Sequence, residues 1–345
     1  MSANNPLVSV IVPVYRNQRF LKAGIESVLA LDYEPLEILI RDDASPDDAY
    51  DAVKQIVKKY KGPHTVKLSR NKKNMSMGNY NRLMDDATAD YIVVCHDDDI
   101  QEPDRVSRIM DVFLNRRVSM VTCNEILLDA DSKKIRLANK EDSNCEVPAT
   151  EIARYGWSTK TNGSALSWTR EVYEKFGPID IDFTTRLSDW IFPFRASLLD
   201  GVYFLEDPLL YKHMHPDQRG AVGLSPADQN VNSAQYSSED IGQIAYMLQA
   251  LDHAEERKML PKSKCTKLRG LLIEQMQEKA INLAKSRNRL HMRNQRMAWV
   301  SRDKGAMIDE EKLRDLEYLM AKKKNYSQRF RRAWEKLVWR MRKSR

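Results

Sequence analysis

The sequence predicts an α/β fold, with a mostly parallel sheet flanked by helices and a helical extension at the C-terminus. Three observations support this prediction. Short β-branched runs alternate with segments of helical periodicity over about the first 95 residues, an order of elements that builds a parallel sheet. Hydrophobic residues make up 42% of the 345 residues, which is ample for a core. From about residue 235 onward Gly and Pro become rare and helical spacing runs nearly to the end.

The first half of the chain alternates strands and helices. Four strands are predicted because each is a short run of β-branched and other apolar residues; they span 7–14, 36–40, 65–68 and 91–95. The spacing of apolar residues predicts a helix after each of the first three strands, over 17–30, 47–60 and 76–87. Ser45 and Asp47 are suitable N-cap residues for the second helix. Beyond residue 115 the alternation weakens, and further strands are predicted at 118–128 and 202–206.

A change in composition divides the chain near residues 225–235. We predict an α/β domain over 1–225, a helical region over 226–320 and a basic amphipathic helix over 321–345. The four cysteines are far apart and lack C-x-x-C spacing, which disfavours a zinc ribbon or disulfide framework and favours a reducing cytoplasm. No apolar run reaches the ~18 residues of a spanning helix, and the N-terminus lacks a signal-peptide pattern, so we expect no integral membrane segment.

The charge of the chain is concentrated at its C-terminal end. The net charge is +7, and residues 321–345 hold eleven Lys and Arg against one Glu. That segment carries +10, which leaves −3 for the other 320 residues. Phe330, Trp334 and Met341 fall on one face of its predicted helix, a pattern that favours an anionic membrane surface. The alternatives are a solvated helix packed on the domain and a contact between subunits in a homo-oligomer. Nucleic acid is not expected, because no RNA-binding motif accompanies the charge.

Two acidic clusters follow directly after predicted strands. Asp42 and Asp43 end the second strand, and residues 97–99 (Asp-Asp-Asp) follow the fourth. In parallel sheets, ligands bind beyond the carboxyl ends of the strands. Three adjacent carboxylates repel one another, so they either face solvent or bind a hard divalent cation such as Mg²⁺ or Mn²⁺.

The first cluster suggests recognition of a nucleotide base. A buried Asp can accept a hydrogen bond from an imide N–H, as on uracil N3, although guanine also offers N–H donors. Helix capping is the alternative role, but Asp42 and Asp43 come too early in the sequence for it.

Five segments in this order resemble family 2 glycosyltransferases with a GT-A fold, which has a Rossmann-like sheet. They are LVSVIVPVYRN (7–17), SVLALDY (27–33), LEILIRDDASPDD (36–48), YIVVCHDDDIQEPDRV (91–106) and SDW (188–190). The resemblance covers roughly residues 7–220. It implies inverting transfer of a sugar from a nucleotide-sugar donor, assisted by Mn²⁺ or Mg²⁺.

The resemblance assigns donor-binding residues one by one. Those implied for the base and ribose are Pro13, Tyr15, Asp42, Asp43 and Asp97, and Asp98 and Asp99 are implied for the metal and diphosphate. The order of roles within the Asp triplet stays open, because His96 stands where the family often has Asp.

Further motifs complete the donor site and the acceptor side. The family's frequent Arg-Asn pair is Tyr80-Asn81 here, so only Asn81 is carried over to donor binding. Gly163 lies in a stretch that resembles the one the family places near the donor sugar, and Asp189 resembles the catalytic base. Capping of the following helix is the alternative for Asp189. His215 resembles a residue that completes the metal or diphosphate site, although a surface role is equally compatible with its loop.

These motifs predict a metal-dependent inverting glycosyltransferase of cell-surface polysaccharide synthesis. We expect UDP-sugar as donor, with dTDP- and GDP-sugars as competitors, and a glycan or lipid-linked acceptor. The expected location is the cytoplasm, peripheral to the inner face of the cell membrane. The alternatives are a non-catalytic nucleotide-sugar-binding scaffold and a nucleotidyltransferase. The latter would usually carry a Gly-rich loop after the first strand, which residues 13–17 lack.

Overall fold

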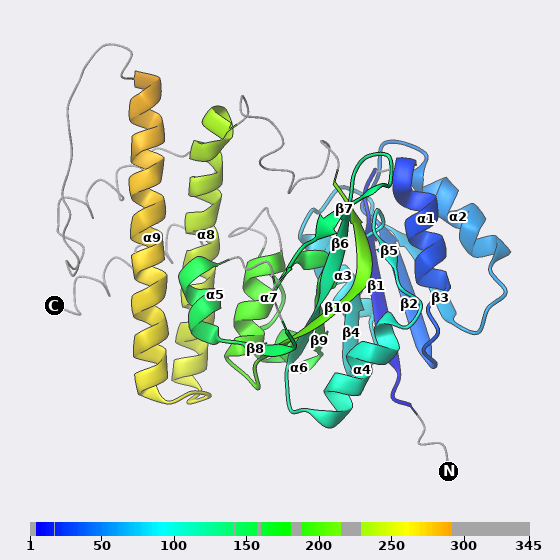
Figure 1. The fold of residues 1–345 in the computed structure, drawn as a ribbon, viewed down its shortest axis with the longest axis horizontal. Coiled ribbons are helices and arrows are strands. Elements are labelled where there is room, and N and C mark those ends of the chain that lie inside the picture. The colour runs from blue at the N-terminus through cyan, green and yellow to red at the C-terminus, as the bar shows by residue number, and fades with distance from the viewer. Residues whose placement is uncertain are drawn as a thin grey trace.

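The computed structural model describes residues 5–16, 18–140, 143–156, 160–180, 188–214 and 229–291 (Figure 1). In this part of the chain a ten-stranded sheet has the order β3-β2-β1-β4-β9-β6-β10-β5, with β7 paired to β6 and β8 to β10. The α/β fold with a helical C-terminal region is therefore confirmed. His215 and residues 321–345 lie outside the described residues.

Four parallel strands form the N-terminal half of the sheet. They are β1 (Val8–Val14), β2 (Leu36–Asp42), β3 (Thr65–Arg70) and β4 (Tyr91–Val94), as predicted. Val14 pairs with Asp42 and Asp42 with Arg70, so these strands end at one edge of the sheet. The helices between them are α1 (Gln18–Leu29), α2 (Ala49–Lys59) and α3 (Gly78–Asp86).

The N-cap of α2 is Asp48, whose side chain makes no capping hydrogen bond, so neither predicted residue holds that position. The Asp47 carboxylate accepts a hydrogen bond from the Ala49 N–H at 3.2 Å. The Ser45 hydroxyl instead accepts from the Arg16 N–H at 3.0 Å, so the prediction for Ser45 was wrong. Arg16, which has a positive φ of 63°, thus connects the end of β1 to the loop after β2.

The C-terminal half of the sheet is mixed. Strand β6 (Met120–Leu128) is buried along its whole length and pairs in parallel with β10 (Val202–His213). The remaining strands are short and were not predicted: β5 (Ile100–Gln101), β7 (Lys134–Leu137), β8 (Cys145–Val147) and β9 (Ser167–Thr169).

Strand β10 is much longer than the predicted 202–206. Polar residues and Pro208 interrupt its apolar pattern, and the pairing with β6 shifts register between Leu205 and Leu210. Beyond this irregularity the strand continues to His213. The extension matters for function, because it carries Lys212 to the carboxyl edge of the sheet.

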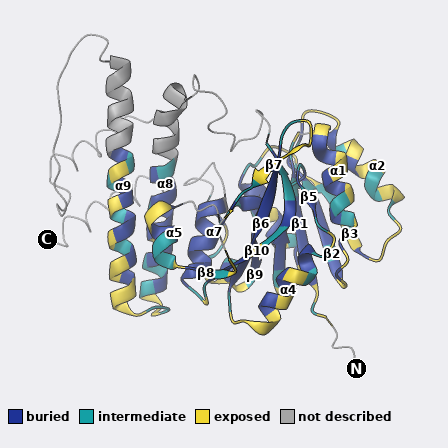
Figure 2. Cartoon of the chain, viewed as in Figure 1, coloured by how far each residue is buried: buried dark blue, intermediate teal, exposed yellow. Residues whose placement is uncertain are grey.

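Helices cover both faces of the sheet. Val8, Val10 and Val12 of β1 pack into the core on the side of α1, α2 and α4 (Arg105–Asn115), whereas Ile11 packs into the core on the other side. This alternation follows from strand geometry, in which successive side chains point to opposite faces. Figure 2 shows the buried strands between helices whose outer faces are exposed.

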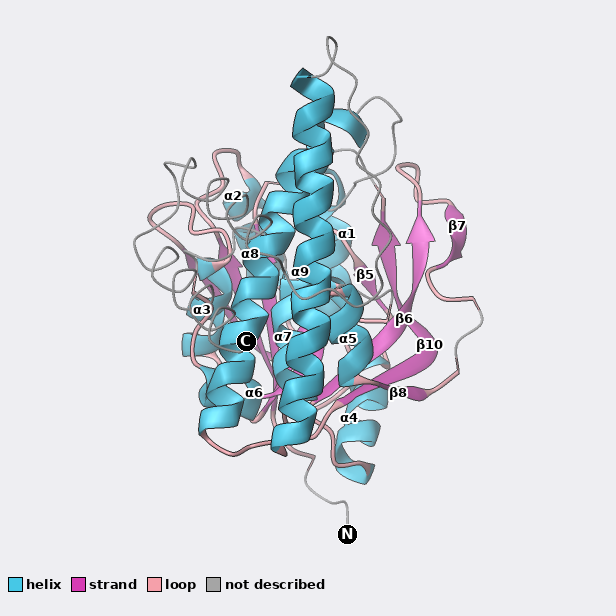
Figure 3. Cartoon of the chain, turned by 90° about the vertical axis from the view of Figure 1, so that its left-hand side faces the viewer, coloured by secondary structure: helices cyan, strands magenta, loops and turns pink. Residues whose placement is uncertain are grey.

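The second face packs against a group of C-terminal helices. These are α5 (Ala149–Tyr155), α6 (Glu171–Phe176), α7 (Ser188–Ser197), α8 (Gln229–Glu256) and α9 (Lys262–His291). The two long helices form a hairpin that contacts α5 and α7 (Figures 1 and 3). None of the described helices combines the length and hydropathy needed to cross a bilayer. The division into domains at 225 and 320 stays a prediction.

Candidate active site

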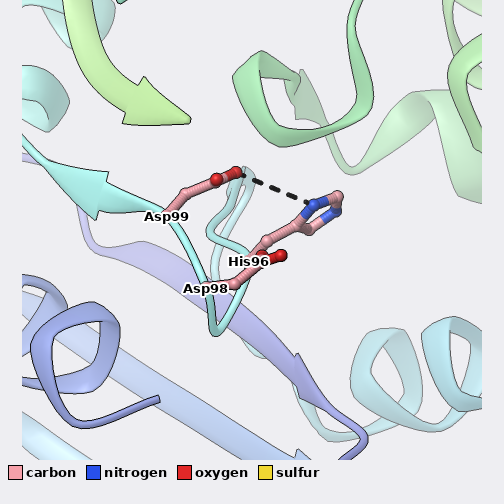
Figure 4. A group of neighbouring side chains, drawn as sticks. All are labelled: His96, Asp98 and Asp99. Carbon is pink, nitrogen blue, oxygen red and sulfur yellow. Dashed lines mark ion pairs between the residues drawn. The ribbon is translucent and has the colours of Figure 1, made fainter. Parts of the chain in front are cut away.

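A potential cation site lies in the loop after β4. One ligand atom from each of His96, Asp98 and Asp99 lies within 4.8 Å of the others (Figure 4). Asp99 is completely buried, and neither of its carboxylate oxygens has a hydrogen bond of good geometry within the described residues. Burial, followed by the negative charge of Asp98, raises the pKa of Asp99 well above its usual range, although the Lys212 ammonium and the Ser164 hydroxyl oppose this shift. A buried carboxylate with so little hydrogen bonding is costly unless a cation compensates it, so these residues fit a divalent metal.

His96 is a member of this cluster that the sequence did not assign. Burial lowers its pKa to about 4, so the imidazole is neutral at physiological pH. Its Nε2 atom lies 3.1 Å from the Tyr80 hydroxyl, and its Nδ1 atom lies 3.9 Å from Asp99 Oδ2. A neutral imidazole held at one nitrogen can offer the other to a metal. The His-x-Asp-Asp spacing is visible in the sequence, but in the family resemblance His96 stands at a position that often holds Asp.

The two carboxylates at the end of β2 do different things. Asp43 accepts hydrogen bonds at 2.8 Å from the backbone N–H groups of Met75 and Ser76 and from Asn71 Nδ2, so it holds the loop after β3. Asp42 is paired with Arg70 Nε at 3.0 Å. Its Oδ1 atom is buried and has no hydrogen-bond partner in the described chain. Of the two residues Asp42 and Asp43, it is therefore Asp42 that has a carboxylate oxygen without a hydrogen-bond partner in the described chain.

The other residues assigned to the donor surround the end of β1. Pro13 lies within β1, and the Tyr15 N–H donates to Asp97 Oδ2 at 3.3 Å. Asn81 instead joins α3 to the segment before α7: its side-chain amide donates to the Ile179 carbonyl at 2.9 Å and accepts from the Ile179 N–H at 2.8 Å. Donor binding by these residues stays a prediction.

The proposed base, Asp189, lies against the turn η1 (Gly163–Ala165). A Cβ atom built on Gly163 would lie 2.2 Å from Asp189 Oδ1, which leaves no room for a side chain. Burial raises the pKa of Asp189 to about 6, although the Lys212 ammonium and the Gly163 N–H lower it. Gly163, assigned from the sequence to the donor sugar, is thus in contact with the candidate base.

A polar network beside Asp189 was not found from the sequence. Lys212 Nζ donates to Asn162 Oδ1 at 2.8 Å, and Asn162 Nδ2 donates to Glu125 Oε2 at 2.7 Å. Glu125 is buried in β6 and also accepts from the Ser164 hydroxyl at 3.3 Å. The sequence feature that could have indicated this network is Glu125, an acidic residue within the predicted strand 118–128.

His213 connects the loop after β4, which carries the three acidic residues 97–99, to β10. Its Nδ1 atom lies 2.6 Å from the Asp98 carbonyl oxygen, and a carbonyl only accepts, so Nδ1 carries the proton. Its Nε2 atom lies 3.1 Å from the Ser132 hydroxyl oxygen. The ring stacks on Phe20 with centroids 4.0 Å apart. His213 therefore holds the backbone of the acidic loop.

Comparison with known proteins agrees with this geometry. The family model "Glycosyl transferase family 2" matches residues 9–172. The chain is 28% identical over 211 residues to an uncharacterized glycosyltransferase from Nostoc sp., covering 60% of the chain and 65% of the relative. It is 34% identical over 96 residues to the GalNAc(5)-diNAcBac-PP-undecaprenol beta-1,3-glucosyltransferase of Campylobacter jejuni, covering 27% and 30%. The matched regions thus span less than two thirds of either relative.

Solved structures share the fold at low sequence identity. TarS 1-349 of S. aureus, in complex with UDP-GlcNAc, aligns with a TM-score of 0.50 and 14% identity over 81% of this chain and 87% of that one. The mannosyltransferase PcManGT of Pyrobaculum calidifontis, in complex with GDP-Man and Mn²⁺, aligns with a TM-score of 0.50 and 15% identity over 97% and 85%. The family match, supported by the curated relatives, identifies residues 9–172 as a domain of glycosyl transferase family 2, and the chain shares the GT-A fold of the solved structures.

Proposed function

We propose that this protein is a metal-dependent, inverting glycosyltransferase that moves a sugar from a nucleotide-sugar to a glycan or lipid-linked acceptor. One observation carries the proposal. The carboxyl edge of the sheet combines a cation-type cluster at His96, Asp98 and Asp99 with a buried carboxylate, Asp189, whose pKa is raised to about 6. A scaffold that only bound the donor would have no use for a base poised near neutral pH.

Asp189 performs the proton transfer in this mechanism. Its carboxylate takes the proton from the acceptor hydroxyl as that oxygen attacks C1 of the donor sugar. The new C1–O bond forms on the face opposite the diphosphate, and the bond from C1 to the diphosphate oxygen breaks, so the configuration inverts. A pKa of about 6 leaves Asp189 mostly ionised at pH 7, yet basic enough to accept a proton in the transition state.

Asp98, Asp99 and His96 would hold the divalent metal. Bound there, a Mn²⁺ or Mg²⁺ ion would supply positive charge for the leaving diphosphate. His213 supports this role because it fixes the Asp98 carbonyl from β10. Mn²⁺ in the mannosyltransferase structure favours the same metal here.

We propose a UDP-sugar as the donor. The unpaired Oδ1 atom of Asp42 is a buried acceptor that could receive the N3–H of uracil. Thymine carries the same N–H, so dTDP-sugars are the nearest competitors. TarS was solved with UDP-GlcNAc, which supports the choice, whereas the mannosyltransferase was solved with GDP-Man.

For the acceptor we propose a lipid-linked glycan at the inner face of the cell membrane. The Campylobacter relative is named for an undecaprenol-linked acceptor. The +10 charge of residues 321–345 would hold the protein at anionic lipid, since each Lys or Arg near such a surface contributes about 1 kcal/mol. These two features support the proposal of a role in surface-polysaccharide synthesis.

The proposal is tested by incubating the full chain with UDP-, dTDP- and GDP-sugars and Mn²⁺ and measuring nucleoside diphosphate release and melting temperature. We expect a UDP-sugar to raise the melting temperature and release UDP, more rapidly with polyprenyl-linked glycan acceptors. Binding without release would indicate the scaffold alternative. Release of pyrophosphate from a nucleoside triphosphate and a sugar phosphate would indicate a nucleotidyltransferase.

A further inference from the structure

Lys212 lies among carboxylates without forming an ion pair to any of them in the described chain. It is partly buried near the end of β10, and its hydrogen bond goes to Asn162 Oδ1 at 2.8 Å. Although burial lowers its pKa, the charges of Glu125, Asp99 and Asp189 raise it overall, so Lys212 is charged. The Lys212 ammonium therefore does two things. It neutralises part of the surrounding negative charge, and its hydrogen bond orients the side-chain amide of Asn162.

The amide of Asn162 begins the turn that contacts Asp189. Its Nδ2 atom donates to Glu125 Oε2 at 2.7 Å, so Lys212 and Glu125 hold the two ends of one amide. Ser164, at the other side of the turn, donates to Glu125 Oε1 at 3.3 Å. Arg105, which is fully buried, donates to the Ser164 carbonyl at 2.9 Å. Charged groups from α4, β6 and β10 therefore fix the turn on both sides of Gly163.

We propose that Lys212 is a positioning residue, which acts through Asn162 to hold the Gly163 turn against the Asp189 carboxylate. The inference rests on the proposed function, because it assigns Lys212 to the same reaction. Lys212 thereby links the last strand of the domain to the base on α7, two segments that share no sequence motif. Its charge also keeps Asp189 ionised, opposing the charge of Glu125.

Two substitutions separate these effects. Lys212→Met removes the charge and the hydrogen bond, whereas Asn162→Ala breaks the link but leaves the ammonium. If the turn fixes the base, both should lower kcat, by up to about 10²-fold, because a displacement of about 1 Å at a reacting group has that effect. Lys212→Met alone should also move the acid limb of the pH–rate profile to higher pH. Lys212→Arg should restore part of the activity.

The assay measures kcat, donor KM and UDP binding with Mn²⁺ for each variant. Lys54→Met, an exposed position on α2, is the matched control and should behave as wild type. Unchanged kcat in both Lys212→Met and Asn162→Ala, or a loss in donor binding alone, would overturn the positioning role. If Lys212→Met does not fold, the kcat of Asn162→Ala decides the question. A wild-type kcat in Asn162→Ala then rejects the proposal.

The wild-type protein distinguishes failure of this inference from failure of the proposed function. If wild type binds donor and turns it over, the variants test Lys212 alone. If wild type binds UDP-sugars with Mn²⁺ but no acceptor supports transfer and no donor is hydrolysed, the glycosyltransferase assignment fails and the role of Lys212 falls with it.

Discussion

Substitution of Gly163 by Ala is the sharpest test of the site geometry. The added Cβ would lie 2.2 Å from Asp189 Oδ1 and 3.1 Å from its Cγ, whereas real Cβ contacts essentially never fall below 3.0 Å. The turn and the carboxylate must therefore separate by about 0.8 Å. A displacement of about 1 Å at a reacting group lowers rates by about 10²-fold, so we expect kcat to fall by about 10- to 100-fold. The Kd for UDP with Mn²⁺ should change little, because the displaced group is the base.

Steady-state kinetics at saturating donor, together with calorimetric titration of UDP, provide the measurement. Gly270→Ala on α9 is the matched control, because nothing lies within 4 Å of its built Cβ. Replacing Gly within a helix should stabilise the protein by about 0.5–1 kcal/mol and leave kcat unchanged. If Gly163→Ala keeps wild-type kcat but weakens donor binding, the glycine serves the donor sugar, as the sequence suggested, and our account of the turn is wrong.

The remaining predictions concern the base, the metal and the tail. Asp189→Asn should keep UDP binding and lower kcat by about 10²–10⁴-fold, the usual size of a general-base effect; wild-type turnover would remove Asp189 from the mechanism. Because burial raises the pKa of Asp189 to about 6, wild-type kcat/KM should fall as pH drops below 6, where the base becomes protonated. The same shift means that the folded protein favours the protonated carboxyl, so Asp189 lowers stability as pH rises from about 4 to 6. Asp189→Asn should accordingly melt at a higher temperature than wild type above pH 6, and an equal or lower melting temperature contradicts this. EDTA should abolish turnover, and added Mn²⁺ should restore it. The variant Asp99→Asn should lose metal-dependent UDP binding. Full activity in the presence of chelator would refute the metal assignment. The full chain should co-sediment with anionic liposomes and be released by high salt, whereas a chain lacking residues 321–345 should not bind; equal binding by both rejects the tail as the anchor.

Some assignments could be reached from the sequence because the signal is local. Strands β1 and β4 are nearly continuous apolar runs rich in β-branched residues, and their burial in the sheet follows directly from that pattern. The acidic residues come at the ends of β2 and β4, and parallel strands must end at one edge. The expectation that Asp97, Asp98 and Asp99 lie at the same edge of the sheet as Asp42 and Asp43 therefore needed no knowledge of long-range contacts.

What each polar side chain does could be decided only by the tertiary structure. Asp42 and Asp43 are neighbours in the sequence, yet Asp43 is occupied by the loop after β3 while Asp42 keeps a free oxygen. Asn81 was assigned to the donor on motif grounds, but its amide is used by the backbone of Ile179, 98 residues away. Hydrogen-bond partners depend on how distant segments meet, which local composition does not encode.

The network around Asp189 shows most clearly the difference between what the local sequence predicts and what long-range contacts decide. Lys212, Asn162 and Glu125 come from three segments that carry no common motif, and nothing in the sequence indicates that their side chains meet. They meet because β10 pairs in parallel with β6 and continues past its irregularity at Pro208. The sequence by itself determined the strands and the chemistry available at their ends. The order of the strands in the sheet, and the length of β10, decided which of those groups lie close enough to act together.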